Sequence, residues 1–414
     1  MSTRVGIIGG GAAGLYAACQ LKRLKEDSDV EVTLIDRNPV PGKKLILTGH
    51  GRCNITNRKD ASQLKKGFHE AEKFIYPALM EFGPEDTMAF AENELGIKLK
   101  EEENNRIFPV CDSAIVVRDT LVQYISDSTE ILREIKVTKI NKTEDFEVIT
   151  DKGIYHFDQI ILSCGGSSFT KTGSTGDSYK FAKRLGHTVN PAKAALAPVK
   201  ADEFFCGICR KLSGVSLNAM VSVFIENKKT ASYEGDVLFA DFGVTGPAVM
   251  EISREIPLDV LEKKVYLELD LVPSMNDEAF DRELQELITA HADTKITTLL
   301  SRFVPASVAA EIAGQAGTAD KYAQGFLKEK RKTICRLMKH LHIGLETAPD
   351  LEKAYVTRGG VVLSEVDRKT MQSKLVPGLY ILGEALDIDG ISGGYNLQAC
   401  MSEAYLAAKS ILSK

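Results

Sequence analysis

Three glycines and one acidic residue near the N-terminus have the spacing of a dinucleotide-binding turn. Gly9, Gly11 and Gly14 form the pattern Gly-x-Gly-x-x-Gly, and Asp36 follows twenty-two residues after Gly14. The first glycine permits a sharp turn, the second lets the backbone approach a pyrophosphate, and the third allows a helix to pack closely on a strand. The phosphates would then lie at the positive end of that helix. Asp36 can accept hydrogen bonds from a ribose hydroxyl, and its charge disfavours a 2′-phosphate there.

A second chemical pattern lies near the C-terminus. A short apolar run at residues 379–382 ends in Gly383-Glu384, and Gly393-Gly394 opens the last helical stretch. An acid at the carboxyl end of a strand suits a ribityl hydroxyl, and a helix N-terminus offers backbone N–H groups to the pyrimidine edge of a reduced flavin. Because NAD has no ribityl chain, the two patterns together favour FAD. Taken by itself, this segment leaves open the alternative of a solvated turn acid followed by an ordinary helix start.

Cysteine and histidine residues give weaker signals. Cys206 and Cys209 have the spacing of a redox dithiol or of half a zinc site, but no second Cys-x-x-Cys completes four ligands. Cys53 lacks the nearby partner that a flavin disulfide reductase would use, so we interpret it as a small packing residue. His340 and His342 lack acidic or cysteine partners at metal-ligand spacing. The sequence therefore predicts no metal site.

A parallel sheet must position these residues. β-branched runs at residues 4–8 and 30–35 flank an apolar helical pattern that reaches Leu24, which indicates a right-handed βαβ unit. The other elements that we expect before residue 190 are a helical region at 71–96, strands at 137–149 and 155–163, and a helix at 177–185. Near the C-terminus we expect a strand at 379–382 and a helix at 394–412.

The pattern of apolar and polar residues changes at Pro191. Alternating β-rich segments at 215–225 and 265–271 are accompanied by helical patterns at 275–315 and 319–341. The earlier pattern resumes near residue 350. We therefore expect a discontinuous α/β domain, residues 1–190 and 350–414, that is interrupted by an inserted substrate domain, residues 191–349.

Length, charge and composition exclude several classes of protein. The chain has 414 residues, which favours two to three domains, and its net charge of −5 gives little support to nucleic-acid binding. The N-terminus lacks the features of a signal peptide, and no apolar run reaches the ~18 residues of a membrane span. Eight scattered cysteines fit reduced thiols. We expect a cytoplasmic protein without nucleic-acid or membrane partners, of open oligomeric state. A basic run at residues 328–332 keeps an RNA-acting flavoprotein as a remote alternative.

Six segments, in order along the chain, resemble the signatures of one family. Over essentially its whole length the chain is similar to the NAD(P)/FAD-dependent oxidoreductases of the aminoacetone oxidase and bile-acid flavoprotein reductase type. The segments that carry the resemblance are residues 42–57 (GKKLILTGHGRCNITN), 106–109 (RIFP), 173–177 (GSTGD), 239–247 (FADFGVTGP), 356–361 (VTRGGV) and 383–390 (GEALDIDG).

The resemblance implies a glutathione-reductase-like FAD-binding Rossmann domain with an inserted domain. The insert would have a β-barrel part, about residues 191–274 and 335–349, and a helical part, about residues 275–334. In the family, the segment that matches residues 43–57 lies along the FAD. The residues that we expect to contact FAD are Gly9, Gly11, Ala12, Ala13, Gly14, Asp36, Arg37, Lys43, Lys44, Arg52, Cys53, Asn54, Asn57, Val137, Cys164, Gly165, Gly166, Gly383, Glu384, Asp387, Gly393, Gly394, Tyr395, Asn396 and Leu397.

The resemblance fixes the cofactor better than the reaction. No second strand-Gly-x-Gly-x-x-Gly-helix pattern is present. Either NADH or NADPH docks transiently against the flavin, or the substrate reduces FAD and oxygen reoxidises it. We favour an NAD(P)H-driven reductase of an activated C=C bond in a small organic molecule. The alternative is a flavin amine oxidase that acts on an aminoacetone-like substrate.

Three side chains are candidates for catalysis. We expect the flavin ring to face the inserted domain, with the substrate between them. Arg106 could clamp a carboxylate or carbonyl oxygen, and Tyr395 could donate a proton. His50, where relatives often have glycine, is a second candidate proton donor. Each has a structural alternative: an arginine that holds a loop, a tyrosine that packs on a ring edge, and a histidine bonded to backbone.

Overall fold

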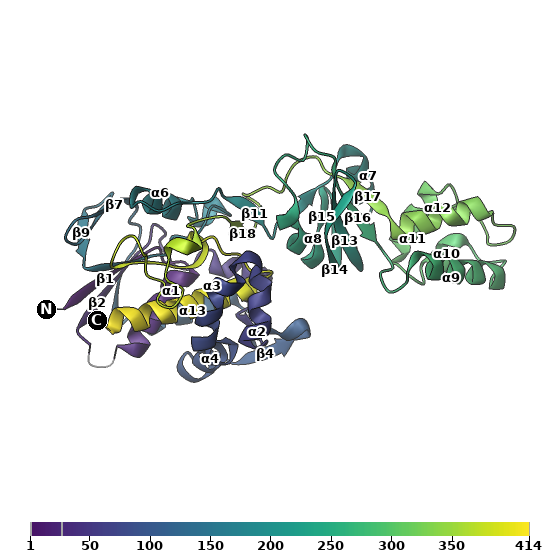
Figure 1. Ribbon diagram of the computed structural model, residues 1–414. Coiled ribbons are helices and arrows are strands. Elements are labelled where there is room, and N and C mark those ends of the chain that lie inside the picture. Colours follow the sequence, from purple (N-terminus) through teal and green to yellow (C-terminus); the bar gives the residue numbers. More distant parts are fainter. Residues whose placement is uncertain (1, 26–27, 414) are drawn as a thin grey trace. The chain divides into compact units, whose positions relative to one another are not determined.

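The chain folds as two compact units. The computed structural model describes residues 2–25 and 28–413. A discontinuous unit comprises Met1–Lys193 and Tyr355–Lys414, and an inserted unit comprises Ala194–Ala354 (Figure 1). Each unit buries a large hydrophobic cluster of its own. Separate cores of this kind are expected of separate folding units.

A five-stranded parallel sheet forms the centre of the discontinuous unit. The strand order is β19-β10-β1-β2-β6, and adjoining strands pair in parallel throughout. All four residues of β10 are buried, as expected of a strand that is covered on both faces. The strands are β1 (Thr3–Ile8), β2 (Val30–Ile35), β6 (Thr129–Leu132), β10 (Gln159–Leu162) and β19 (Leu379–Ile381).

Two helices from opposite ends of the sequence pack against one another in this unit. They are α1 (Ala12–Leu24), which follows β1 directly, and α13 (Gly393–Leu412), which ends the described chain (Figure 1). Gln20 on α1 is fully buried, and its amide nitrogen lies 3.5 Å from the Met401 sulfur on α13. The glycine turn after β1 and the loop before α13 therefore belong to one packed core.

Smaller elements complete the discontinuous unit. Two three-stranded antiparallel sheets have the orders β3-β5-β4 and β7-β8-β9. Their strands are β3 (Thr56–Asn57), β4 (Leu99–Glu102), β5 (Arg106–Pro109), β7 (Val137–Lys142), β8 (Phe146–Thr150) and β9 (Ile154–Phe157). The helices are α2 (Ala61–Leu64), α3 (Glu72–Glu81), α4 (Pro84–Ala89), α5 (Ala114–Ile125) and α6 (Asp177–Arg184). The chain passes between the units at β11 (Lys193–Ala195) and β18 (Val356–Arg358).

Three elements expected in this unit are wrong in their extent. The strand expected at residues 137–149 is the β7-β8 hairpin, because Thr143 N donates to Asp145 O and turns the chain. The strand expected at 155–163 divides into β9 and β10, which belong to different sheets. The helical region expected at 71–96 divides between α3 and α4, because Phe82 leaves the helical conformation, with φ −146°, and Pro84 begins the next helix.

A curled antiparallel sheet forms one part of the inserted unit. Its order is β12-β15-β14-β13-β16-β17, and a bridge between Ala201 and Leu345 joins the two outer strands. Burial alternates along β16, so one face of the curled sheet is directed to the core. The strands are β12 (Val199–Lys200), β13 (Ser216–Ile225), β14 (Lys228–Ala240), β15 (Gly243–Thr245), β16 (Val265–Asp270) and β17 (Leu341–Gly344).

The helices of the inserted unit are shorter than the sequence suggested. They are α7 (Glu203–Lys211), α8 (Pro247–Ile252), α9 (Asp277–Ala290), α10 (Ile296–Leu300), α11 (Ala306–Gln315) and α12 (Lys328–Lys339). The helix expected at 275–315 is three helices, and Pro305 stands at the N-cap of the third. The helix expected at 319–341 begins only at Lys328, after a turn at Gly325 with φ +66°. Residues 335–339, expected in the β-barrel part, complete α12.

The curled sheet and the helices share one core. Leu267 and Leu269 on β16 belong to the same buried cluster as Ile334 and Met338 on α12. The buried Lys339 ammonium lies 2.6 Å from Asp270 Oδ2 and donates to Val272 O. In the part of the chain that the structure describes, no helix is long and apolar enough to cross a membrane.

Candidate dinucleotide site

The turn between β1 and α1 forms a cradle that side chains would fill. Gly9 has φ +103°, and a Cβ there would lie 2.6 Å from the Cys164 backbone. A Cβ on Gly14 would lie 2.0 Å from the Gly9 carbonyl oxygen. At Gly11 the nearest atom is 3.8 Å away, at Ser163 O. A Cβ on either outer glycine would therefore clash with protein, while one on the middle glycine would make only an ordinary van der Waals contact, so this part of the turn has room for a pyrophosphate to approach. Ala12 and Ala13 form the first turn of α1.

Asp36 lies at the end of β2 and supports this turn. It is 6% exposed, and its Oδ2 accepts from Gly10 N at 2.6 Å. Its Oδ1 accepts from Asn38 N at 2.6 Å. Burial raises the pKa of Asp36, while the N–H donors of Asn38 and Gly10 lower it. The carboxylate is thus bonded to backbone on both oxygens, which leaves further lone pairs for a ribose.

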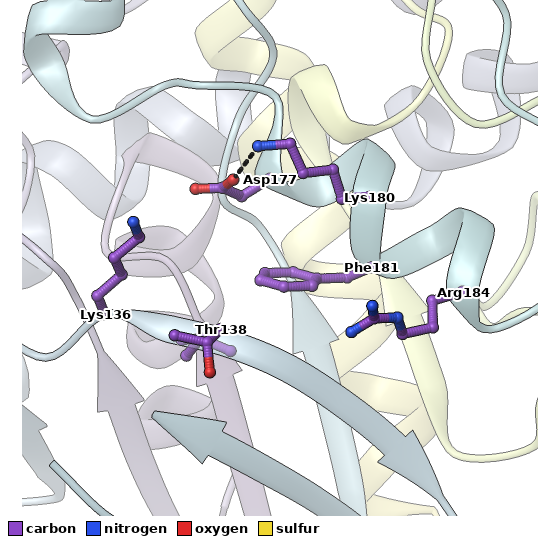
Figure 2. Close-up of a pocket in the computed structure, with 7 residues that line it drawn as sticks. Lys136, Thr138, Asp177, Lys180, Phe181 and Arg184 are labelled. Carbon is purple, nitrogen blue, oxygen red and sulfur yellow. Dashed lines mark hydrogen bonds and ion pairs between the residues drawn. The ribbon is translucent and has the colours of Figure 1, made fainter. Parts of the chain in front are cut away.

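Arg37 connects Asp36 to a pocket beside α6. Its Nη1 lies 3.0 Å from Asp177 Oδ2, and Asp177 also pairs with Lys180 (Figure 2). The pocket has a volume of about 360 Å³. Figure 2 shows the Phe181 ring between the cationic side chains of Lys136 and Arg184. The residues that line the pocket are Lys136, Val137, Thr138, Asp177, Lys180, Phe181 and Arg184. Val137, expected to contact FAD, thus lines the same pocket as Asp177, the partner of Arg37.

The C-terminal acid is held in an ion pair. Lys44 Nζ lies 3.0 Å from Glu384 Oε1 and also donates to Ser168 Oγ at 2.7 Å. Thr357 N donates to Glu384 Oε2 at 3.2 Å. Gly383, before the acid, has φ +62°, in the left-handed region that favours glycine. Lys44 and Glu384 are therefore in direct contact, although they are 340 positions apart in the sequence. Both are expected neighbours of FAD.

The N-terminus of α13 is open. Ser392 is the N-cap, and its side chain makes no capping hydrogen bond. A Cβ on Gly393 would meet nothing within 4 Å, whereas one on Gly394 would lie 2.8 Å from the buried Asn54 amide. The Asn396 side chain bonds to both Gly390 N and O at 3.0 Å, which fixes the approach to the helix. An uncapped N-terminus of a long helix provides N–H donors for an electron-rich partner.

The segment from Lys43 to Asn57 is partly buried in the core. Cys53 has φ +65° and no exposed surface, and burial raises the pKa of its thiol to about 12. Asn57 is 4% exposed, and its Nδ2 donates to Asn104 O at 2.7 Å. Arg52 pairs with Glu102 at 2.8 Å, and Lys43 is exposed. Arg52 is therefore held by β4 through an ion pair.

Other expected FAD neighbours lie around the end of β10. Cys164 Sγ donates to Ile8 O at 3.1 Å, and burial raises the pKa of this thiol to about 12. A Cβ on Gly165 would lie 2.8 Å from Ser174 Oγ, and one on Gly166 would lie 2.4 Å from Thr357 Oγ1. Two more expected neighbours complete the set, Asp387, which accepts from Gly359 N at 2.9 Å, and the buried Leu397.

The three catalytic candidates have different surroundings. Tyr395 is 3% exposed, and its hydroxyl accepts from Lys59 Nζ at 3.1 Å. Arg106 donates to Glu103 O at 3.0 Å, within its own turn. His50 is exposed and has φ +56°. Tyr395 is thus the one of the three whose functional group is buried beside a charged partner.

A family model described as "HI0933-like protein Rossmann domain" matches residues 3–410. The chain belongs to this family. It is 29% identical over 415 residues to a 3-dehydro-bile acid delta(4,6)-reductase of Clostridium scindens, with 98% of each chain covered. It is also 29% identical over 420 residues to a ribosomal RNA dihydrouridine synthase of Haemophilus influenzae, covering 98% of this chain and 97% of the relative. A solved 3-ketosteroid delta1-dehydrogenase from Sterolibacterium denitrificans shares the fold, with 11% identity, a TM-score of 0.54 and 100% of both chains covered.

As a member of the HI0933-like family, the protein is an FAD-dependent oxidoreductase with a glutathione-reductase-like Rossmann core. The residues present fit FAD. The open face at Gly11 can accommodate the pyrophosphate, and the N-terminus of α13 can accommodate the electron-rich edge of the flavin. The predicted family, fold class and enzyme class are confirmed.

Sequence reasoning missed four polar residues that support the site. Lys59 contacts Tyr395, and its position two residues after the expected neighbour Asn57 was a usable signal. Ser168 and Thr357 hold Lys44 and Glu384; Thr357 lies in the family-like segment 356–361, whereas Ser168 lies in none of the six segments. Glu403 is fully buried on α13, and a single acid in an alanine-rich helix gives no sequence signal of burial.

Proposed function

We propose that this HI0933-like protein is an NAD(P)H-driven reductase of a C=C bond that is conjugated to a carbonyl group. The observation that carries the proposal is the chemistry in the names of two of its relatives. A delta(4,6)-reductase of a 3-dehydro-bile acid acts on double bonds that can be conjugated to the 3-oxo group. A dihydrouridine synthase saturates the uracil C5=C6 bond, which is conjugated to the C4 carbonyl. Both activities add two hydrogens to an electron-poor alkene.

The chain supplies binding and proton transfer for such a reaction. FAD, held at the turn after β1 and at the N-terminus of α13, would supply hydride chemistry toward the β-carbon of the substrate, with NAD(P)H as the source of the electrons. Tyr395 delivers the proton to the α-carbon from its hydroxyl. The Lys59 ammonium, 3.1 Å from that hydroxyl, stabilises the tyrosinate that remains. The Lys59 ammonium then returns a proton to the tyrosinate, and because Lys59 is only half-buried, it recovers that proton from solvent.

Anaerobic stopped-flow mixing tests this proposal. We expect NADH or NADPH to bleach the flavin absorbance, and a conjugated enone to restore it without oxygen. The amine oxidase is the alternative. It replaces our proposal if neither nicotinamide bleaches the flavin faster than buffer does, while aminoacetone or another amine does.

The relative from H. influenzae favours a second candidate, in which the alkene is a uracil base of ribosomal RNA. The basic run at 328–332 lends it little support, because three of its cations are engaged within the inserted unit. Lys330 donates to Ala316 O at 2.8 Å, and Lys332 and Arg331 pair with Asp281. Incubation with ribosomal RNA and NADPH, followed by mass spectrometry of the nucleosides, distinguishes the two. Dihydrouridine in the product would assign RNA as the substrate in place of a small molecule.

A further inference from the structure

Glu403 is a carboxyl group enclosed in the core of the discontinuous unit. It lies on α13 and has 0% exposed surface. Its Oε2 accepts from Gly383 N at 2.6 Å. Its Oε1 is buried and has no hydrogen-bond partner within the described chain. A buried oxygen without a partner is costly, so this arrangement calls for a reason other than packing.

The peptide that Glu403 holds joins the two halves of the dinucleotide site. Gly383 has φ +62°, and a Cβ there would lie 3.0 Å from Ala13 Cβ and 3.2 Å from Cys400 Sγ. Ala13 belongs to the first turn of α1, at the pyrophosphate end of the site. The next residue, Glu384, is the acid that we assign to the ribityl chain. A shift of the Gly383 peptide would therefore disturb both ends of the cofactor.

No cation within the described residues is available to pair with Glu403. The Lys44 ammonium is paired with Glu384, at 3.0 Å. On α3, Glu81 pairs with Lys409 at the exposed side of α13. Cys400 on α13 interacts electrostatically with Glu403, and Tyr16 on α1 interacts with Cys400; burial raises the pKa of both groups well above the ordinary value. Both are neutral near pH 7, so an ionised Glu403 would be an uncompensated charge.

We propose that Glu403 is a positioning residue for FAD: its neutral form holds the Gly383 peptide in place, and its ionisation weakens FAD binding. An ionised Glu403 would place a negative charge beside the helix turn that receives the two negative charges of the pyrophosphate. The proposal concerns retention of the cofactor. It therefore applies equally to a reductase and to an oxidase, and it can fail while the proposed reaction stands.

Burial sets the pH range of this effect. It raises the pKa of Glu403 to about 8, although the Gly383 N–H lowers it. Since FAD binds the protonated form, its dissociation constant is constant below this pH. Above it, the dissociation constant rises by up to about tenfold per pH unit, as expected for one linked proton.

Titration of the full-length apoprotein with FAD between pH 6.5 and 9.5, followed by flavin fluorescence, tests the proposal. We expect wild type to lose FAD affinity above about pH 8, and Glu403→Gln to keep the low-pH affinity throughout, because glutamine can accept from Gly383 N without charge. A wild-type dissociation constant that does not change with pH would overturn the proposal. An unchanged rise in Glu403→Gln would do the same.

A matched control and a second readout complete the test. Cys400→Ala removes a titratable group that interacts with Glu403 and should keep the wild-type rise in the FAD dissociation constant. If Glu403→Gln does not fold, proton uptake on FAD binding can be measured with wild type in weakly buffered solution. We expect an uptake of close to one proton at pH 9 and none at pH 6.5. The absence of uptake at pH 9 contradicts the proposal.

Discussion

At the scale of single residues, the two acids of the candidate site already accept hydrogen bonds from the protein. Asp36 accepts from Gly10 N and Asn38 N, and Glu384 pairs with Lys44. Such acids are fixed before the cofactor arrives, which lowers the entropy lost on binding. In our assignment, neither carboxylate would need to move to accept a hydrogen bond from a sugar or ribityl hydroxyl.

We predict that Asp36→Ala and Glu384→Ala each weaken FAD binding without unfolding the protein. Each change removes a charged acceptor, which costs about 1–3 kcal/mol, or roughly 5- to 150-fold in the dissociation constant. Equilibrium dialysis with FAD measures the affinity, and circular dichroism checks the fold. Glu81→Ala removes an exposed acid of α3 and is the control. Wild-type affinity in both variants would show that the dinucleotide is placed wrongly.

We predict that Tyr395→Phe slows substrate reduction about a hundredfold and leaves flavin reduction by NAD(P)H unchanged, because only the second half-reaction needs the proton. Lys59→Met should slow the same step, and the double variant should be no slower than Tyr395→Phe, since the two residues act as one unit.

Rapid mixing separates the two half-reactions. The solvent deuterium isotope effect on substrate reduction should be absent in Tyr395→Phe. The exposed Lys66 provides a matched control, Lys66→Met. Equal slowing of both half-reactions would indicate a structural role.

At the scale of elements, the βαβ unit could be predicted from the sequence because the signals for it are local. β-branched strands, a glycine turn and an apolar helix each follow from neighbouring residues, and β1, α1 and β2 form as predicted. The turn of the β7-β8 hairpin was missed because a backbone hydrogen bond between Thr143 and Asp145 makes it, and the residue types there do not predict such a bond. The partners of Glu384 were missed because Lys44, Ser168 and Thr357 converge only in the tertiary fold.

At the joint between α12 and β17, His340 connects two acids. Its Nδ1 lies 3.2 Å from Glu268 and its Nε2 lies 2.8 Å from Asp277. Desolvation lowers the pKa of His340, but the bonds to Asp277 and Glu268 outweigh it and raise the pKa above the ordinary value. Because the pKa of His340 is higher in the folded state than in the unfolded state, the protonated ring stabilises the fold fully below about pH 6.5, the ordinary histidine pKa. That stabilisation is lost as the pH rises through the folded pKa.

We therefore predict that His340→Ala lowers the free energy of unfolding of the inserted unit at pH 6 and has a much smaller effect at pH 9. Urea denaturation at the two pH values measures the difference. His291→Ala is the control, because the His291 ring contacts the cation Arg302 rather than a carboxylate. A penalty for His340→Ala that is the same at both pH values would show that the ring acts through packing alone.

At the scale of the whole molecule, FAD binding is assigned to one unit, and each unit has its own hydrophobic core. The discontinuous unit contains every residue that we assign to FAD, and the inserted unit has its own sheet, helices and buried cluster. A ligand stabilises only the unit that it binds, by about 2.7 kcal/mol at a hundredfold excess over its dissociation constant. FAD should therefore act on the stability of one unit and not on that of the other.

Scanning calorimetry tests this division with two matched variants. We predict two unfolding transitions, of which FAD raises one. Leu162→Ala on β10 and Leu269→Ala on β16 both truncate a leucine with 0% exposed surface, which costs about 2–5 kcal/mol. Leu162→Ala should lower the transition that FAD raises, by several degrees, and Leu269→Ala should lower only the other. A single transition that both variants and FAD shift together would mean that the two cores unfold as one cooperative unit.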